Sequence, residues 1–374
     1  MDTTQALPLL GGLTADQFMK RHWQKKPLLV RGAVPGFQPL LDRAGLFGLA
    51  SCEDVESRLV AQSAKGWAMR RGPVARRSLP PVSRAGWTLL VQGVDLHLDG
   101  AHELLSRFRF VPQARLDDLM ISWAADGGGV GPHFDSYDVF LLQAQGRRRW
   151  RIGRQKDLSL QEGAPLKILA NFEPEQEHVL EPGDMLYLPP RYAHDGVAQG
   201  ECQTYSIGFR APARAELARE LLQRIADEAE DMPDAIYADR KQDATATPGA
   251  IPAALQGFAR DALHTALDDP LALDRALGEY LTEPKASVWF DPQASRRRMR
   301  GVTLDRRTRM MYDARHVFIN GEGYLASGRD AALMRRLADE RALDDTELSR
   351  ASAGALSLLA SWCKSGWIHP GGRS

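Results

Sequence analysis

Short apolar runs, each long enough for one strand, follow one another through residues 85–210. Gly, Pro and Asp signals separate them, and the runs include WTLLVQGV, DLMISW, DVFLLQ, WRIG, MLYLPP and YSIGF. Strands at this cadence favour an antiparallel barrel or sandwich. We therefore expect an all-β unit in this part of the chain.

The pattern changes after FRAP at residues 209–212. Apolar residues then recur at helical spacing, at Leu217, Leu221, Leu222 and Ile225, and again at Leu255, Phe258, Leu263 and Leu267. The last hundred residues combine a hairpin candidate, HVFINGEGYLA with Asn320-Gly321 at the turn, with the helical stretches GRDAALMRRLADERA and ASAGALSLLASWCKSGW. A chain of 374 residues is too long for one core, so this α+β protein should have two or three domains.

Composition excludes several classes of protein. Lysine plus arginine and aspartate plus glutamate both number 48, so net charge does not point to nucleic acid or an anionic membrane. No apolar run approaches the roughly 18 residues of a membrane span, and no basic start precedes an apolar block at the N-terminus. Cys52, Cys202 and Cys363 are far apart and odd in number, which is typical of a reducing compartment. We expect a cytoplasmic protein without a membrane span.

Two histidines and one aspartate form a candidate metal site. His133 and Asp135 lie two apart in GPHFDSYDVF, so both side chains should project from one face of an extended segment. His194 follows the strand in EPGDMLYLPPRYAHDG, on the next bend. Each signal is weak alone, but two imidazoles with one carboxylate are the facial triad of non-haem Fe(II) oxygenases. Zinc fits less well, because structural zinc sites have four ligands that usually include cysteine.

Arg148, in QAQGRRRWRIG, indicates which ligand fills the coordination positions that the protein leaves open on such a metal. We expect a turn at Gln145-Gly146 and then a strand in which Arg148 shares the buried face with Trp150 and Ile152. A buried guanidinium needs an anionic partner, and this strand supplies none. A dicarboxylate such as 2-oxoglutarate would supply one, with one end on iron and the other on Arg148. The other arginines of the run are expected to be solvated.

These motifs together resemble the Jumonji-C cupin oxygenases. The resemblance covers DDLMISW, GGGVGPHFDSYDVF, GRRRWRIG, EPGDMLYLPPRYAHDG and YSIGFRAP. With HWQKKPLLVRGA it narrows to the bacterial ribosomal oxygenases, which hydroxylate an arginine of a large-subunit ribosomal protein, the sixteenth. It implies a double-stranded β-helix (cupin) barrel over residues 1–212, a helical dimerisation segment over 213–280 and a C-terminal winged helix over 281–374.

The resemblance also assigns roles to individual residues. His133, Asp135 and His194 match the iron ligands, with Fe(II) as the metal, and Arg148 matches the residue that binds the far carboxylate of the co-substrate 2-oxoglutarate. Ser122 matches a strand hydroxyl that contacts the same carboxylate.

Other side chains are candidates without a settled role. Thr204 or Ser206, in the closing strand, could reach the co-substrate. Asp126, Tyr137 and Tyr192 could frame the mouth of the barrel and bind a guanidinium. The apolar positions of residues 213–280 exceed what two helices beside a barrel can bury, which favours a homodimer.

Three alternatives stay open. The same iron chemistry could act on a histidine or a methylated lysine, because the triad and Arg148 would be unchanged. A cupin-derived binding module could act through the winged helix without catalysis. The basic clusters RRGPVARRS and SRRRMRGVTLDRRTR make nucleic acid a further candidate, but no aromatic stacking motif accompanies them, and we predict a ribosomal protein as the partner.

Overall fold

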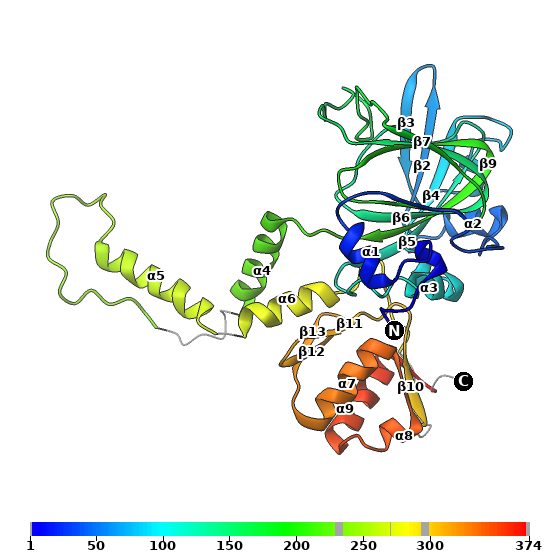
Figure 1. The fold of residues 1–374 in the computed structure, drawn as a ribbon. Helices are drawn as coiled ribbons and strands as arrows, with labels where there is room; N and C mark the ends of the chain where they lie inside the picture. Colours follow the sequence, from blue (N-terminus) through cyan, green and yellow to red (C-terminus); the bar gives the residue numbers. More distant parts are fainter. Residues whose placement is uncertain (1, 229–234, 270, 293–298, 372–374) are drawn as a thin grey trace. The chain divides into compact units, whose positions relative to one another are not determined.

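The computed structural model describes residues 2–228, 235–269, 271–292 and 299–371. The chain forms two compact units, residues 1–211 and 212–374 (Figure 1), which are blue to green and green to red in the picture. The division into three parts at residues 212 and 280 stays a prediction. Within the described ranges, no helix is both long enough and apolar enough to cross a membrane.

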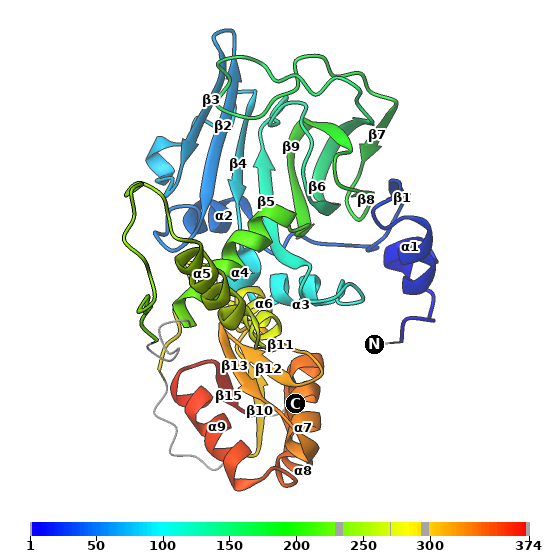
Figure 2. The same ribbon diagram turned by 90° about the vertical axis from the view of Figure 1, so that its left-hand side faces the viewer.

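An antiparallel sheet of nine strands runs through the described part of the first unit. The strands are β1 (Leu28–Val30), β2 (Ser57–Ser63), β3 (Gly66–Arg71), β4 (Trp87–Val91), β5 (Leu116–Ala124), β6 (Asp138–Gly153), β7 (Gln176–Leu180), β8 (Met185–Leu188) and β9 (Ala193–Phe209). Their order is β1-β8-β6-β9-β5-β4-β2-β3, with β7 also paired to β6. Figure 2 shows β3, β2, β4, β5 and β9 side by side. The antiparallel β unit predicted from the apolar runs is confirmed.

The two longest strands, β6 and β9, pair along most of their lengths, from Asp138 opposite Phe209 to Gly153 opposite Ala193. The register shifts near Gly146, which has φ +62° and where an added Cβ would lie 2.1 Å from a backbone carbonyl of β9. The turn predicted at Gln145-Gly146 is therefore wrong, because β6 continues through a bulge. A glycine permits either a turn or a bulge at this position, and only the pairing with β9 shows which of the two forms.

Short helices and an aromatic core tie the N-terminal segment to the sheet. The helical elements are η1 (Pro8–Leu10), α1 (Ala15–Arg21), α2 (Arg43–Leu49), η2 (Arg76–Ser78), η3 (Val94–Leu96) and α3 (Asp99–Ser106). Thr14 caps α1 in a capping box with Gln17. Phe18 of α1 is fully buried, and its ring centroid lies 5.0 Å from that of Tyr187 and 5.4 Å from that of Phe140. The packing ties α1 to β6 and β8, and β6 supplies residues to the site described below.

In its described residues, the second unit combines three helices with a small α+β fold that contains three more. The helices are α4 (Arg214–Glu228), α5 (Ala253–Leu267), α6 (Ala272–Thr282), α7 (Gly328–Glu340), α8 (Asp345–Leu348) and α9 (Ala353–Lys364). The strands are β10 (Gly301–Leu304), β11 (Met310–Tyr312), β12 (His316–Ile319), β13 (Glu322–Leu325), β14 (Ala342–Asp344) and β15 (Ile368–Pro370), in two sheets ordered β14-β10-β15 and β11-β12-β13. Asn320 and Gly321, both with positive φ, form the predicted turn between β12 and β13.

Helix α5 buries none of its residues in the described chain. Its Leu255, Leu263 and Leu267 are 38%, 69% and 52% exposed, whereas Ile225 of α4 is 6% exposed. A homodimer through this segment stays a prediction. Part of the C-terminal basic cluster, residues 296–298, lies outside the described residues.

Candidate functional site

His133 and His194 are brought together by an isolated backbone bridge between a loop and the start of β9. The His133 amide donates to the His194 carbonyl at 3.0 Å, and the His194 amide donates to the His133 carbonyl at 2.8 Å. Asp135 lies in the loop before β6, where its carbonyl accepts a 2.7 Å hydrogen bond from the Arg191 amide. His133 and Asp135 therefore lie outside the named strands, and His194 lies in β9 rather than on the bend that the sequence predicts for it.

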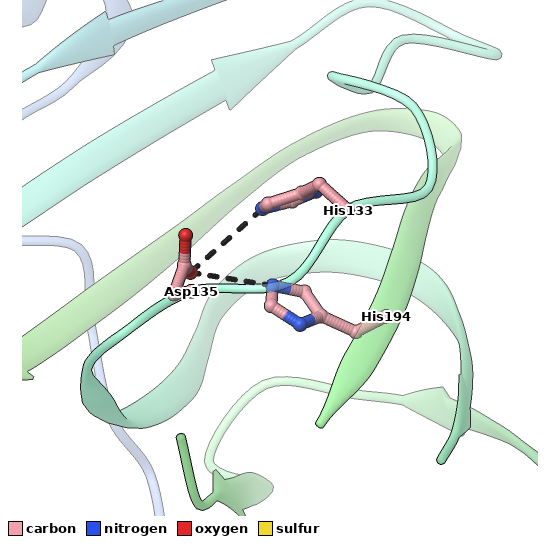
Figure 3. Close-up of side chains that lie close together, drawn as sticks. All are labelled: His133, Asp135 and His194. Atoms are coloured by element: carbon pink, nitrogen blue, oxygen red, sulfur yellow. Dashed lines mark ion pairs between the residues drawn. The ribbon is translucent and has the colours of Figure 1, made fainter. Parts of the chain in front are cut away.

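The three side chains converge on one point (Figure 3). Asp135 Oδ2 lies 3.8 Å from His133 Nε2 and 3.7 Å from His194 Nε2, and one ligand atom from each residue lies within 4.8 Å of the others. An ion bound at about 2.1 Å from two atoms requires those atoms to lie within about 4.2 Å of each other. Both distances from Asp135 to a histidine meet this condition, and the three residues together are placed to hold one metal ion.

Hydrogen bonds orient both imidazoles for metal binding. His133 Nδ1 lies 2.9 Å from the Gly131 carbonyl oxygen, and His194 Nδ1 lies 3.0 Å from that of Tyr192. Each Nδ1 therefore carries the proton and donates it to a carbonyl, which leaves the Nε2 lone pair directed toward Asp135. Burial lowers the pKa of His194 well below its usual range, and the neighbouring His133 lowers it further. The imidazole is consequently neutral at pH 7, as a metal ligand must be.

A cavity of about 100 Å³ begins at this triad and ends at Arg148. Its wall includes polar residues from five segments of the chain, namely Thr88, Ser122, His133, Asp135, Arg148, Trp150, His194 and Ser206. Arg148, Trp150 and Ile152 are 4%, 5% and 0% exposed, which confirms that they share the buried face of β6.

Arg148 is a buried cation that has no counter-charge among the described residues. Its Nη1 donates to Ser122 Oγ at 3.0 Å, and its guanidinium carbon lies 5.6 Å from the centroid of the Trp150 ring. Its Nε and Nη2 have no hydrogen-bond partner among the described residues, and no described carboxylate lies within ion-pair distance. Buried charges are normally paired, so an acceptor-rich anion fits this end of the cavity.

A second, wider cavity of about 400 Å³ opens onto His133 and Asp135 of the triad. Both cavities are lined by His133, Asp135 and Ser206. The wider one also contains Asp118, which is 6% exposed, and Tyr137, which is 37% exposed. A second reactant could therefore approach the triad from the side opposite Arg148.

The other sequence candidates lie elsewhere or have partners. Thr204 Oγ1 donates to Gln143 Oε1 at 2.9 Å and lines neither cavity, so its contact with a ligand stays a prediction. Asp126 accepts a hydrogen bond from the Gly200 amide, and the Tyr192 hydroxyl donates to Glu175. Neither Asp126 nor Tyr192 lines these two cavities.

Sequence reasoning missed Thr88 and Asp118. Thr88 is the one polar residue in the fully buried strand β4, WTLLV, and a lone threonine there could have been noticed. Asp118 sits within the apolar stretch of DDLMISW and is buried as well. A buried polar residue inside an apolar strand is informative, because burial of such a group requires a partner.

Two family models match this chain. Residues 103–217 match the JmjC domain, and residues 265–369 match the ROXA-like winged helix. Among curated relatives, the ribosomal protein uL16 3-hydroxylase of Escherichia coli (strain K12) is 41% identical over 203 residues, 54% of this chain and 53% of that protein. The probable ribosomal oxygenase of Haemophilus influenzae is 37% identical over 210 residues, 55% of this chain and 52% of that protein. The matches span about half the length of these relatives.

Solved structures of Escherichia coli YcfD are similar over nearly the whole chain. One has a TM-score of 0.83 at 29% identity and covers 96% of this chain and 98% of its own. Another, described as a ribosomal oxygenase in complex with cobalt and 2-oxoglutarate, has a TM-score of 0.78 at 29% identity with the same coverage. These matches confirm the predicted cupin-type barrel and winged helix. This chain is thus similar to JmjC-domain proteins over residues 103–217 and to ROXA-like winged helices over residues 265–369.

Proposed function

We propose that this protein is an Fe(II)- and 2-oxoglutarate-dependent oxygenase that hydroxylates an arginine side chain of a large-subunit ribosomal protein, uL16. The observation that carries this proposal is a single cavity with the His133–Asp135–His194 triad at one end and the unpaired Arg148 guanidinium at the other. The first group suits a metal with open positions and the second suits a carboxylate.

The residues present fit both absent groups. His133, Asp135 and His194 would hold Fe(II), and Arg148 would pair with the far carboxylate of 2-oxoglutarate. When bound, the iron supports the oxidative decarboxylation of 2-oxoglutarate by dioxygen to succinate and carbon dioxide, with the second oxygen atom inserted into a substrate C–H bond. The chain itself orients the two imidazoles, anchors the dicarboxylate and keeps water from the inner cavity, whose lining is largely buried.

An arginine substrate fits the wider cavity. A guanidinium pairs with carboxylates and stacks on aromatic rings, and the buried Asp118 with the half-exposed Tyr137 offers both. Asp117 also lines this cavity, with its Oδ1 accepting from Arg210 Nε at 2.9 Å. The name of the relative at 41% identity, a uL16 3-hydroxylase, supports the same client. Histidine or methyl-lysine as the target remains the alternative that the test below separates.

The first experiment asks whether the site is an oxygenase centre. Anaerobic full-length protein is titrated with Fe(II) and 2-oxoglutarate, and we expect a visible charge-transfer band that requires both components. His133→Ala should abolish the band because it removes one imidazole ligand. Absence of the band in the unmodified protein would favour a non-catalytic binding module instead.

The second experiment identifies the target residue. Ribosomal proteins from cells with and without this gene are compared by intact-mass and fragment analysis, and one arginine of uL16 should lack an oxygen atom when the gene is absent. An oxygen on a histidine would remove the arginine assignment and leave the iron chemistry. No mass change in any ribosomal protein would remove the client altogether.

The role of Asp118 has a matched control. We expect Asp118→Asn to raise the KM for a uL16 peptide about tenfold or more, because a charge-assisted hydrogen bond contributes roughly 1.5–3 kcal/mol. Asp126→Asn changes the charge equally at a residue outside both cavities and should leave the KM unchanged. Equal effects of the two substitutions would show that net charge, and not a contact at Asp118, determines peptide binding.

The exposed leucines of α5 support a further proposal, a homodimer through this helix. The cysteine pattern and a ribosomal client support a cytoplasmic location. We propose no nucleic-acid contact, because the described part of the basic cluster comes with no stacking aromatic pattern.

A further inference from the structure

The inner cavity contains more unpaired hydrogen-bond donors than Arg148 alone provides. Thr88 Oγ1 and Trp150 Nε1 have no hydrogen-bond partner among the described residues, as is true of Arg148 Nε and Nη2. Thr88 is 1% exposed, Trp150 5% and Arg148 4%, and all three line the cavity. An unsatisfied buried polar group costs about 1–3 kcal/mol, so three such residues lining one cavity indicate a ligand that accepts hydrogen bonds.

Ser122, in contrast, is already satisfied. Its Oγ donates to the Thr204 carbonyl at 3.2 Å and accepts from Arg148 Nη1 at 3.0 Å. A serine hydroxyl has a single proton, so in this arrangement Ser122 has no donor left for a ligand. Its contacts hold the Arg148 guanidinium in place.

The strand register places Thr88 beside this pair. In the pairing of β4 with β5, Leu90 lies opposite Ser122 and Thr88 lies opposite Ala124. Residues two apart on a strand project from the same face, so Thr88 faces the cavity next to Ser122. The cavity lining, which includes Thr88, Leu90 and Ser122, agrees with this register.

The orientation of Trp150 leaves its N–H edge away from the neighbouring strand. Its benzo ring packs on Gly196 of β9, where an added Cβ would lie 2.6 Å from ring carbons Cη2 and Cζ3. These carbons are on the opposite side of the indole from Nε1. The ring lies between Arg148, 5.6 Å from the guanidinium carbon, and His194, 5.8 Å from the imidazole centroid.

We propose that Thr88 and Trp150 are co-substrate-binding residues, and that with Arg148 they form a four-donor cradle for the far carboxylate. Ser122 then acts as a positioning residue for Arg148. The four donors are Arg148 Nε and Nη2, the Thr88 hydroxyl and the Trp150 indole N–H, and a carboxylate offers about four lone-pair sites. The cradle selects a dicarboxylate over a 2-oxo acid with an apolar end, which would leave every donor unpaired. This inference rests on the proposed function.

The test measures binding rather than turnover. Full-length Thr88→Val and Trp150→Phe are loaded with Mn(II) under anaerobic conditions and titrated calorimetrically with 2-oxoglutarate and with 2-oxopentanoate, which lacks the far carboxylate. Each variant should bind 2-oxoglutarate roughly tenfold or more weakly, because it loses a hydrogen bond to a charged group. Binding of 2-oxopentanoate should not change. Thr88→Ser, which keeps the hydroxyl, should restore affinity for 2-oxoglutarate.

A matched control comes from Ser57→Ala, which removes a buried hydroxyl that donates to the Ala50 carbonyl and lines neither cavity. It should lower the melting temperature of the metal-free protein and leave 2-oxoglutarate binding unchanged. Thr88→Val should show the reverse, with the melting temperature unchanged or raised.

Three outcomes separate the inference from the proposed function. If the unmodified protein binds no 2-oxoglutarate, the proposed function fails and the cradle fails with it. If it binds 2-oxoglutarate but Thr88→Val and Trp150→Phe bind as tightly, only the cradle is overturned. The cradle is also overturned if both variants weaken 2-oxoglutarate and 2-oxopentanoate equally, which would place the effect at the metal end.

Discussion

Replacement of Arg148 by methionine separates ligand anchoring from a structural role for this cation. The substitution keeps a long, flexible apolar side chain in the barrel and removes the guanidinium. It eliminates one hydrogen bond, to Ser122 Oγ, and the contact with the Trp150 ring. It also eliminates two buried nitrogen donors, Nε and Nη2, that have no hydrogen-bond partner in the described chain.

In the metal-free protein, removal of the unsatisfied donors offsets or exceeds the loss of these contacts. The lost hydrogen bond contributes about 1 kcal/mol and the cation–π contact about 0.5–2 kcal/mol. The two unsatisfied donors cost about 1–3 kcal/mol each. We therefore expect the metal-free Arg148→Met protein to unfold at an unchanged or slightly higher temperature.

Co-substrate binding should respond very differently. Removal of one partner of a buried ion pair costs roughly 3–5 kcal/mol, which corresponds to a Kd for 2-oxoglutarate at least about 10²-fold higher. Calorimetric titration of Mn(II)-loaded protein under anaerobic conditions measures the Kd, and differential scanning calorimetry with a chelator measures the stability of the empty protein. Metal content should be unchanged, because the triad is untouched.

The control is Arg147→Met, which removes the same charge from an exposed position on the opposite face of β6. It should change neither measurement. An equal loss of affinity in Arg147→Met would refute the assigned strand facing. A large drop in stability of Arg148→Met with unchanged affinity would show that Arg148 is a structural cation.

Three further predictions concern dimerisation, the bulge and the second unit. Leu263→Glu on α5 should convert a dimer to a monomer in light scattering, and a monomeric unmodified chain at micromolar concentration would contradict the proposed interface. Gly146→Ala should lower the melting temperature by roughly 5–10 °C, because the added Cβ meets a carbonyl of β9. Its control is Gly200→Ala, also at positive φ but with open space around the added Cβ, and this variant should lower the melting temperature far less. Burial raises the pKa of Asp305, but hydrogen bonds from Arg307 outweigh this effect and hold the pKa at about 2. The ionised carboxylate therefore stabilises the fold at any pH above its unfolded pKa, which is near 3.9. This stabilisation is lost as the pH falls toward 2. Asp305→Asn should therefore reduce the stability of the second unit by about 2 kcal/mol at pH 7 and flatten its pH dependence between pH 4 and pH 2, measured by thermal unfolding.

Local pattern determined the parts of this protein that depend on near neighbours in the chain. Alternation along β6 was enough to predict that Arg148 faces inward, because successive side chains on a strand point to opposite faces. Apolar spacing predicted the strand-rich half and the helices that follow. The ligand types of the triad were readable as well, since HxD and a later histidine supply a recognisable donor set.

Only the tertiary structure decided which residues, distant in sequence, line the same cavity. Thr88 lies 34 positions before Ser122, and their common face depends on the register of β4 against β5, which no local pattern specifies. The same holds for Gly146, where the approach of β9 makes a bulge out of an apparent turn. Strand register and the meeting of His133 with His194 are set by contacts between segments far apart in the chain. For that reason the sequence alone predicted the kind of chemistry, and the fold assigned the residues that surround it.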